Sequence, residues 1–311
     1  MSHSDGRDES CPYKGFMTTI RDALQQGMQQ LLAANPSEEH SIGRLGRLDT
    51  QVLLAHVLGI ERAMLYAYPE RELTPEQEQQ FSALLARRAQ GEPVAYLLGH
   101  KEFYGLDFIV DSRVLIPRPE TELLVETALQ QIRLRLAAGQ MPVVADIGTG
   151  SGAISITLAV EEPRLPYLYA SDISAEALAV ARLNCQQHYV EARVRLLQGD
   201  LLAPLPEAVD VLLANLPYVG TDEMDQLTPD VVNYEPHLAL FSGPKGLALL
   251  YRLLDEIRQS ATLKSNAVIL LEIGYQQREP LQHYLHEHWP QAEVTALMDY
   301  AGWDRVLQIQ V

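Results

Sequence analysis

From Met141 to the end of the chain, short apolar runs alternate with segments of helical periodicity, and this alternation is the strongest constraint on the fold. The sequence predicts strands at 142–147, 167–172, 193–197, 209–214, 267–273, 293–298 and 305–310. It predicts helices at 153–160, 175–188, 246–259 and 276–287. Strands that alternate with helices build a doubly wound, largely parallel sheet with right-handed crossovers. No helix of useful length fits between 299 and 304, so we expect the last two strands to form an antiparallel hairpin.

The chain before this region divides into three predicted segments. Residues 1–15 lack hydrophobic periodicity, and we expect a mobile tail. Residues 16–90 have helical periodicity and predict a small helical-bundle domain, in which Thr74, Pro75 and Gln77 form a typical helix start. Residues 91–116 carry Gly and Pro between the β-type runs VAYLL, EFYGL and DFIV, and predict a β-hairpin linker. The α/β domain is then expected to comprise residues 117–311.

Composition places the chain among globular proteins. Its 311 residues are 47% hydrophobic and 21% charged, and this length predicts about two domains. The two cysteines, Cys11 and Cys185, lie far apart without CxxC spacing, which argues against a disulfide scaffold and a structural zinc site. We therefore expect a cytoplasmic protein without a bound metal. No run of about 18 apolar residues and no apolar segment near the N-terminus is present, so we expect neither a membrane span nor a signal peptide.

A glycine-rich segment, ADIGTGSGAIS (145–155), joins the first predicted strand of this domain to its helix. Glycines at alternate positions permit a tight turn, and they allow a ligand to approach the positive N-terminal end of the helix. In open α/β sheets this turn binds nucleotides. A structural turn and a dinucleotide site are alternatives, because Gly148, Gly150 and Ala153 also satisfy G-x-G-x-x-G/A. The motif alone does not separate these interpretations.

Two aspartates follow the next two strands. Asp172 ends the strand of LYASDIS, where a carboxylate can accept both hydroxyls of a ribose. Its alternative role is to cap the following helix, although Ser174 is equally well placed for that. Asp200 follows a strand in QGDLL, where a carboxylate can meet an adenine amino group, and a loop aspartate without a ligand is the alternative.

The most informative motif is Asn215-Leu216-Pro217-Tyr218, which directly follows the strand 209–214. It resembles the [DNS]PP[YFW] signature of methyltransferases that act on planar amino or amide nitrogens. An amide nitrogen shares its lone pair with its carbonyl and is a poor nucleophile. The Asn215 side-chain oxygen and the carbonyl of residue 216 can accept its two hydrogens, which orients the nitrogen and stabilises developing positive charge. The Tyr218 ring can pack against the target group and add cation–π attraction.

With these motifs together, the sequence resembles the HemK/PrmC family of S-adenosylmethionine-dependent glutamine methyltransferases, which modify peptide-chain release factors. The resemblance runs from about residue 45 to 311 and is most specific in the segment 91–126. Further matching segments are DIGTGSGAISI (146–156), ASDIS (170–174), NLPYV (215–219) and YEPHLALFSGPKGL (234–247). It implies a Rossmann-like, seven-stranded class I methyltransferase domain, preceded by a helical substrate-docking domain and a β-hairpin linker.

The resemblance also implies functional residues. S-adenosyl-L-methionine, whose product is S-adenosyl-L-homocysteine, is expected to contact Asp146, Gly148, Thr149, Gly150, Ser151, Gly152, Asp172, Asp200 and Asn215. The substrate glutamine is expected to contact Asn215, Leu216, Pro217 and Tyr218, of which Asn215, Pro217 and Tyr218 are the expected catalytic residues. The family usually has Pro where this chain has Leu216. Pro at that position restricts the preceding residue to extended conformations, and Leu216 removes this restraint.

The charge distribution bears on the partner. The chain has 24 basic and 41 acidic residues, a formal charge of −17, which argues against stable contact with a nucleic-acid backbone. No Lys or Arg lies between Arg195 and Lys245, whereas eight acidic residues do: Asp200, Glu207, Asp210, Asp222, Glu223, Asp225, Asp230 and Glu235. This acidic segment is either a solvated surface or a rim that attracts a basic protein loop.

The leading interpretation is N5-methylation of the glutamine in the Gly-Gly-Gln loop of class 1 release factors. Methylation of a glutamine in a ribosomal protein is a close alternative. An N6-adenine or N4-cytosine nucleic-acid methyltransferase shares the Asn215–Tyr218 chemistry but requires a basic cleft. A nicotinamide-dependent dehydrogenase fits the glycine loop and leaves Asn215–Tyr218 unexplained, and a non-catalytic binding module is the remaining alternative.

Overall fold

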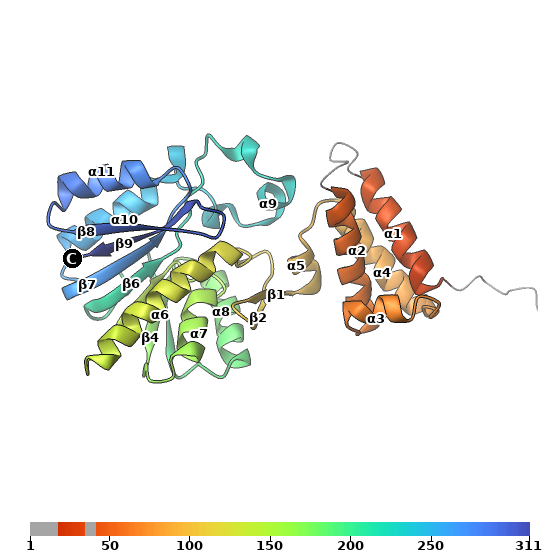
Figure 1. The fold of residues 1–311 in the computed structure, drawn as a ribbon, viewed down its shortest axis with the longest axis horizontal. Coiled ribbons are helices and arrows are strands. Elements are labelled where there is room, and N and C mark those ends of the chain that lie inside the picture. Colours follow the sequence, from red (N-terminus) through yellow and green to blue (C-terminus); the bar gives the residue numbers. More distant parts are fainter. Residues whose placement is uncertain (1–17, 35–41) are drawn as a thin grey trace, which may run out of the picture. The chain divides into compact units, whose positions relative to one another are not determined.

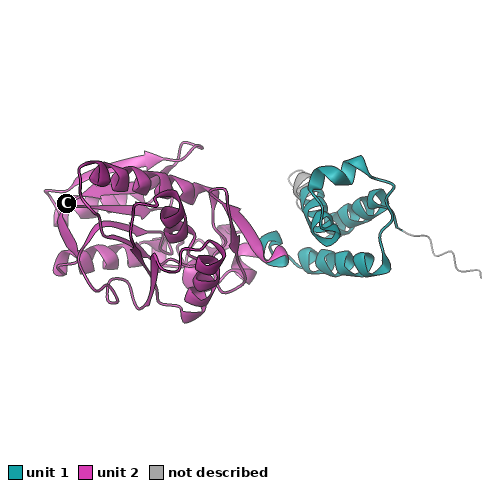
Figure 2. Ribbon diagram, turned by 90° about the horizontal axis from the view of Figure 1, so that it is seen from below, with its two compact units in different colours: residues 1–97 teal, residues 98–311 magenta. Residues whose placement is uncertain are grey.

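The computed structural model describes residues 18–34 and 42–311, so Cys11 and the tail predicted at 1–15 lie outside the described residues. The chain divides into two compact units, residues 1–97 and residues 98–311 (Figure 2). Of the helices in the described ranges, none has the length and apolar character that a membrane span requires. Cys185 is a free, buried thiol.

The first unit contains helices α1 (Ile20–Ala34), α2 (Ile42–Leu58), α3 (Arg62–Ala67) and α4 (Pro75–Ala89). Gly27 on α1 permits close packing, because a Cβ there would lie 2.8 Å from Cγ2 of Thr50 on α2. The predicted start of α4 is confirmed as a capping box: the Thr74 hydroxyl accepts from the Gln77 amide at 3.3 Å, and Gln77 Oε1 accepts from the Thr74 amide at 3.0 Å. This part of the chain is helical, as predicted.

The sequence pattern predicted a β-type run at VAYLL, and this prediction is wrong. The residues form the short helix α5 (Val94–Leu98). The carbonyl of Pro93 accepts hydrogen bonds from the amides of Tyr96 and Leu97, which closes a helical turn. Strands β1 (His100–Phe103) and β2 (Leu106–Ile109) then pair antiparallel and confirm the hairpin. Tyr104 and Gly105 form its turn with φ of 53° and 72°, the left-handed conformation of two-residue hairpin loops.

The second unit is built on a seven-stranded sheet in the order β5-β4-β3-β6-β7-β9-β8. The strands are β3 (Val144–Ile147), β4 (Leu168–Asp172), β5 (Val194–Gln198), β6 (Val209–Ala214), β7 (Leu263–Glu272), β8 (Glu293–Met298) and β9 (Asp304–Gln310). β5, β4, β3, β6 and β7 are parallel, whereas β9 runs antiparallel to β7 and to β8. The doubly wound sheet and the terminal hairpin are thus confirmed.

Helices cover both faces of this sheet (Figure 1). α6 (Glu122–Ala137), α7 (Ala153–Glu161) and α8 (Ala175–Gln187) share one buried hydrophobic cluster with the sheet. α10 (Ala248–Gln259) and α11 (Arg278–His288) share a second cluster with it. Between β6 and α10, where the sequence predicted neither a helix nor a strand, the chain forms the short helix α9 (Pro229–Tyr234) and three 3₁₀ turns. Burial on both faces fixes the strand ends that carry polar side chains.

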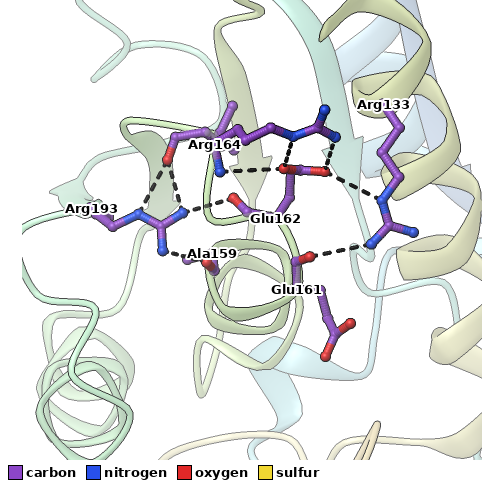
Figure 3. Close-up of polar contacts among 7 residues, drawn as sticks. Arg133, Ala159, Glu161, Glu162, Arg164 and Arg193 are labelled. Atoms are coloured by element: carbon purple, nitrogen blue, oxygen red, sulfur yellow. Dashed lines mark hydrogen bonds and ion pairs between the residues drawn. The ribbon is translucent and has the colours of Figure 1, made fainter. Parts of the chain in front are cut away.

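A polar network fastens the C-terminal end of α7 (Figure 3). The carboxylate of Glu162, 3% exposed, accepts two hydrogen bonds from Arg164, at 2.7 and 2.8 Å, and one from Arg133 of α6 at 3.3 Å. Arg193, just before β5, donates to the main-chain carbonyls of Ala159, Glu162 and Leu165. Hydrogen bonding from Arg164 holds the pKa of Glu162 at about 2, so this carboxylate is charged at neutral pH.

Candidate active site

A cavity of about 290 Å³ opens at the carboxyl ends of the central parallel strands. β3 lies between β4 and β6, so the chain crosses from one side of β3 to the other at this edge. Such a switch point is where ligands bind in open α/β sheets. The cavity is lined by the glycine loop, by the segment 113–121, and by residues that follow β4, β5 and β6. All of these elements belong to the second unit.

The glycine loop forms one wall. Gly148, Gly150 and Gly152 have φ of 76°, 56° and 83°, which confirms that the turn needs a left-handed backbone at all three positions. The amides of Gly148 and Thr149 both donate to the carbonyl of Ser171 at the end of β4. A Cβ at Gly150 would meet nothing within 4 Å, so the loop presents an open backbone surface there. Thr149 and Ser151 line the cavity beside it.

Asp146 lies beneath the loop and is not among the described residues that line the cavity. It is fully buried, and its Oδ2 accepts a hydrogen bond from the Thr149 hydroxyl at 2.6 Å. Burial raises its pKa to about 6, although Thr149 acts in the opposite direction. The structure therefore gives Asp146 a supporting contact with the loop.

Asp172 stands at the cavity wall, where the sequence predicted a ribose-binding carboxylate. Its Oδ2 accepts from the Gly150 amide and its Oδ1 from the Ser174 amide, both at 2.9 Å. Ser174 caps α8 by accepting from the amide of Ala177, so Asp172 is not needed for that role. Each carboxylate oxygen keeps a lone pair after these bonds. Burial raises the pKa of Asp172.

Asp200 also lines the cavity, and it forms an ion pair with Arg252 of α10. Half of its side chain is exposed. The structure thus places Asp200 near the other predicted residues and gives it a cationic neighbour that the sequence pattern did not indicate.

Asn215, Leu216 and Pro217 line the cavity at the end of β6. The Asn215 side-chain nitrogen Nδ2 donates to the hydroxyl of Thr121 at 3.1 Å, and the Oδ1 atom of this amide accepts no hydrogen bond from the described residues. Leu216 is 5% exposed and packs over the glycine loop. Two motifs 67 residues apart, counted from Gly148 to Asn215, therefore meet at one cavity.

Tyr218 is not among the described lining residues. Its hydroxyl donates to Oε1 of Glu272 at 3.2 Å, and its carbonyl accepts from Gln277 Nε2 at 2.7 Å. Burial raises the pKa of the Tyr218 hydroxyl. Gly246 lies against this carbonyl with φ of 67°, and a Cβ there would lie 1.8 Å from the Tyr218 oxygen. The backbone after Asn215 is thus fixed from two sides.

Most of the acidic segment has structural partners. Asp222 accepts from the Lys245 amide, Glu223 from the Gly220 amide, and Asp210 pairs with Lys264. Glu207 accepts from the hydroxyls of two tyrosines. Glu235 is buried and pairs with Arg118, whereas Asp225 is exposed. Most of these carboxylates therefore serve the fold, and the acidic-rim hypothesis now rests on the few exposed side chains, among them Asp225.

Sequence reasoning missed three residues that support the site, Arg118, Thr121 and Glu272, and it placed Glu235 in the acidic segment without its partner Arg118. Arg118 and Thr121 line the cavity, and they belong to IPRPETE (116–122), which lies in the family-specific segment 91–126 but predicted no site residue. The unusual density of charge and proline in that segment was the available signal. Glu272 ends the buried stretch 267–272 of β7, whose other residues are apolar, and a charged residue in such a stretch is itself a signal of a buried function.

Comparisons with known proteins fit this geometry. Residues 22–99 match the family described as PrmC N-terminal domain, and residues 120–234 match the methyltransferase small domain. The chain is 38% identical over 292 residues to the release factor glutamine methyltransferase of Koribacter versatilis (strain Ellin345), with 93% of this chain and 97% of that protein covered. It is 40% identical over 288 residues to the protein of the same name from Moorella thermoacetica (strain ATCC 39073 / JCM 9320), with 92% and 96% covered.

A solved structure, the hMettl16 catalytic domain in complex with MAT2A 3′UTR hairpin 6, superposes with a TM-score of 0.53. It is 17% identical and covers 73% of this chain and 81% of its own. At that identity the likeness concerns the fold alone, and it agrees with the seven-stranded sheet described above.

Proposed function

The chain belongs to the release factor glutamine methyltransferase family, and from this premise we propose that it methylates N5 of the glutamine in the Gly-Gly-Gln loop of class 1 peptide chain release factors. The observation that carries the proposal is the Asn215 amide, held by Thr121 at the wall of a cavity that the glycine loop also lines. A free amide oxygen at that position is the acceptor that a planar nitrogen substrate requires.

The residues of the cavity fit S-adenosyl-L-methionine as the methyl donor. When bound, this cofactor supplies a methyl group on a positively charged sulfonium, and S-adenosyl-L-homocysteine is the product. Asp172 is fixed by two backbone amides and keeps lone pairs for the two hydroxyls of a ribose. Ile173 and Leu201 supply apolar wall for a purine, and Asp200 is proposed to face its amino group. The open backbone at Gly150 leaves room for close approach, with Asp146 supporting the loop from below.

The acceptor side of the proposal uses the residues after β6. Asn215 Oδ1 accepts one N–H of the substrate amide, and the carbonyl of Leu216 accepts the other. Two fixed acceptors hold the nitrogen with its lone pair toward the donor, and they favour the positive charge that develops on it. Pro217 keeps Leu216 extended, because a residue before proline is restricted to extended backbone.

Tyr218 is proposed to contact the substrate through its ring, since it directly follows the acceptor segment. Its hydroxyl is engaged by Glu272 and its carbonyl by Gln277, so the ring position is fixed before substrate arrives. The first unit, residues 1–97, is proposed to dock the release factor.

The test is mass spectrometry of a purified class 1 release factor after incubation with the protein and isotopically labelled methyl donor. One labelled methyl group on the glutamine of the Gly-Gly-Gln loop is expected, and Asn215→Ala is expected to incorporate it about a thousandfold more slowly. Parallel incubations with ribosomal proteins, DNA and RNA, and a nicotinamide oxidation assay, address the alternatives. Methyl transfer only to one of those substrates would refute the proposal.

A further inference from the structure

Glu272 is a buried carboxyl group that the proposed chemistry does not use. It ends β7 and is fully buried. Its Oε1 accepts from the Tyr218 hydroxyl, whereas Oε2 has no aligned hydrogen-bond partner among the described residues. A buried, unsatisfied carboxylate oxygen is costly, and such a group in a native fold calls for an explanation.

Thr121 lies between this carboxyl group and the acceptor amide. It is 4% exposed, and its Oγ1 accepts a hydrogen bond from Asn215 Nδ2 at 3.1 Å. A threonine hydroxyl has one proton to donate, and that proton is not used in the bond to Asn215. The Thr121 side chain also acts on Glu272 as a hydrogen-bond donor that lowers the pKa of the carboxyl group. This effect places the Thr121 hydroxyl near the Glu272 carboxyl group, although the described residues show no aligned hydrogen bond between the two groups.

We propose that Glu272 is a positioning residue: by accepting the Thr121 hydroxyl proton, it makes Thr121 an obligate acceptor and so fixes which end of the Asn215 amide faces the cavity. The inference rests on the proposed function, since it concerns the group that receives the substrate amide. With Thr121 as acceptor, Nδ2 of Asn215 points to Thr121 and Oδ1 is presented to the substrate. Glu272 sets this orientation without touching the substrate.

The opposite state explains why the orientation needs control. When Glu272 is uncharged, the Thr121 hydroxyl is free to donate its proton. A 180° rotation of the Asn215 side-chain amide then lets Oδ1 accept a hydrogen bond from Thr121. Nδ2 then faces the cavity and meets the N–H groups of the substrate. Two donors that face each other cannot hydrogen-bond, so the substrate amide loses one of its two acceptors.

The charge on Glu272 depends on the groups packed around it. Burial raises its pKa to about 7, Arg305 of β9 and the Tyr218 hydroxyl act to lower it, and Glu120 acts to raise it. Glu272 therefore gains its charge as the pH rises through neutrality. We expect kcat to rise with pH through about 7 and then to level off.

The first experiment measures kcat and KM across this pH range for four variants. Glu272→Gln is expected to lower kcat about tenfold at pH 8 and to remove the rise near pH 7. Thr121→Val is expected to lower kcat by about tenfold or more, and Thr121→Ser, which restores the hydroxyl, to bring it back to within about threefold. KM for the release factor is expected to change less than kcat. Glu120→Gln is the matched control, because it removes a nearby exposed carboxylate that contacts neither Thr121 nor Asn215 in the proposal. It is expected to shift the rise of kcat to lower pH and to leave the plateau of kcat unchanged.

The second experiment follows the side-chain amide of Asn215 by NMR in the protein without cofactor or substrate. Its ¹⁵N and ¹H shifts are expected to titrate near pH 7, and the titration is expected to vanish in Glu272→Gln. If the wild-type protein methylates release factor while Glu272→Gln keeps its kcat, pH profile and Asn215 titration, the inference is overturned. If the wild-type protein transfers no methyl group to release factor, the proposed function fails. The NMR titration then still tests whether Glu272 orients the Asn215 amide through Thr121.

Discussion

Leu216 packs directly over Gly148, so that a Cβ on Gly148 would lie 2.9 Å from Cδ2 of Leu216. This contact joins the two motifs of the site, the glycine loop after β3 and the acceptor segment after β6. It also gives a role to the residue that departs from the family's usual proline. Leu216 fills the space above the glycine loop with an apolar side chain.

Gly148→Ala is expected to lower the affinity for S-adenosyl-L-homocysteine by at least about tenfold, because a left-handed alanine costs about 1 kcal/mol and its Cβ also displaces Leu216. Isothermal titration calorimetry measures the effect. Gly139→Ala is the matched control, since Gly139 has φ of 75° and its Cβ would meet nothing within 4 Å. That variant is expected to lose stability alone. Equal affinity losses in both variants would show that the contact with Leu216 is irrelevant.

Asn215→Ala is expected to lower kcat by about three orders of magnitude, about 4 kcal/mol of barrier, because it removes the acceptor for the substrate amide. Leu216→Pro, by contrast, keeps the carbonyl at position 216 and is expected to stay within about tenfold of the wild-type kcat. Single-turnover kinetics with labelled methyl donor compare the two. Near-normal turnover by Asn215→Ala would remove the proposed mechanism.

Glu272→Gln is expected to stabilise the protein above pH 7. The folded-state pKa of Glu272 is about 7, above its ordinary value of 4.5, so the folded state holds its proton more tightly than the unfolded state. Stability is therefore lost as the pH rises from about 4.5 to about 7, by at most about 3 kcal/mol. Urea unfolding at pH 5 and pH 8 measures the difference. A variant that is destabilised equally at both pH values would contradict this sign.

Glu162→Gln is expected to destabilise the protein at neutral pH by about 1–3 kcal/mol, since its pKa is held at about 2, below the ordinary 4.5. This contribution is present above about pH 4.5 and is lost as the pH falls toward 2. Thermal unfolding from pH 7 to pH 3 should show the two proteins converging in acid. The neighbouring Glu161→Gln is the control, because Glu161 contributes its main-chain carbonyl to the network (Figure 3). A constant difference at all pH values would argue against the charge.

Asp225→Lys tests what is left of the acidic-rim hypothesis. Asp225 is exposed and follows the acceptor segment, whereas Asp222 and Glu223 hold backbone amides and cannot be reversed without damage to the loop. If the rim attracts a basic release factor, the variant is expected to slow association a few-fold at low salt and to flatten its salt dependence. Stopped-flow binding measures both. Glu293→Lys, an exposed reversal at the start of β8, should leave them unaltered.

Much of the catalytic fold could be predicted because its signals are local. The strand after Met141, the glycine loop and the acceptor segment each depend on a few consecutive residues, and the doubly wound, largely parallel sheet follows from alternation. VAYLL failed because an apolar run of five residues fits a strand or one helical turn equally, and the bonds to Pro93 decide between them. The roles of Thr121 and Glu272 could not be predicted for another reason. Their roles depend on which distant strand ends become neighbours.

The contacts behind Asn215 have a consequence for the order in which this protein becomes competent. Thr121 and Glu272 are 272 − 121 = 151 residues apart in the chain, and Arg118 reaches Glu235 across 117. We expect contacts of such separation to form late, because the entropy cost of closing a long loop must be met before the contact stabilises the fold. During synthesis the glycine loop emerges well before β7. A nascent chain can therefore contain the complete glycine loop while the Asn215 amide still lacks the contacts that orient it. Methyl transfer then becomes possible only once β7 has joined the sheet.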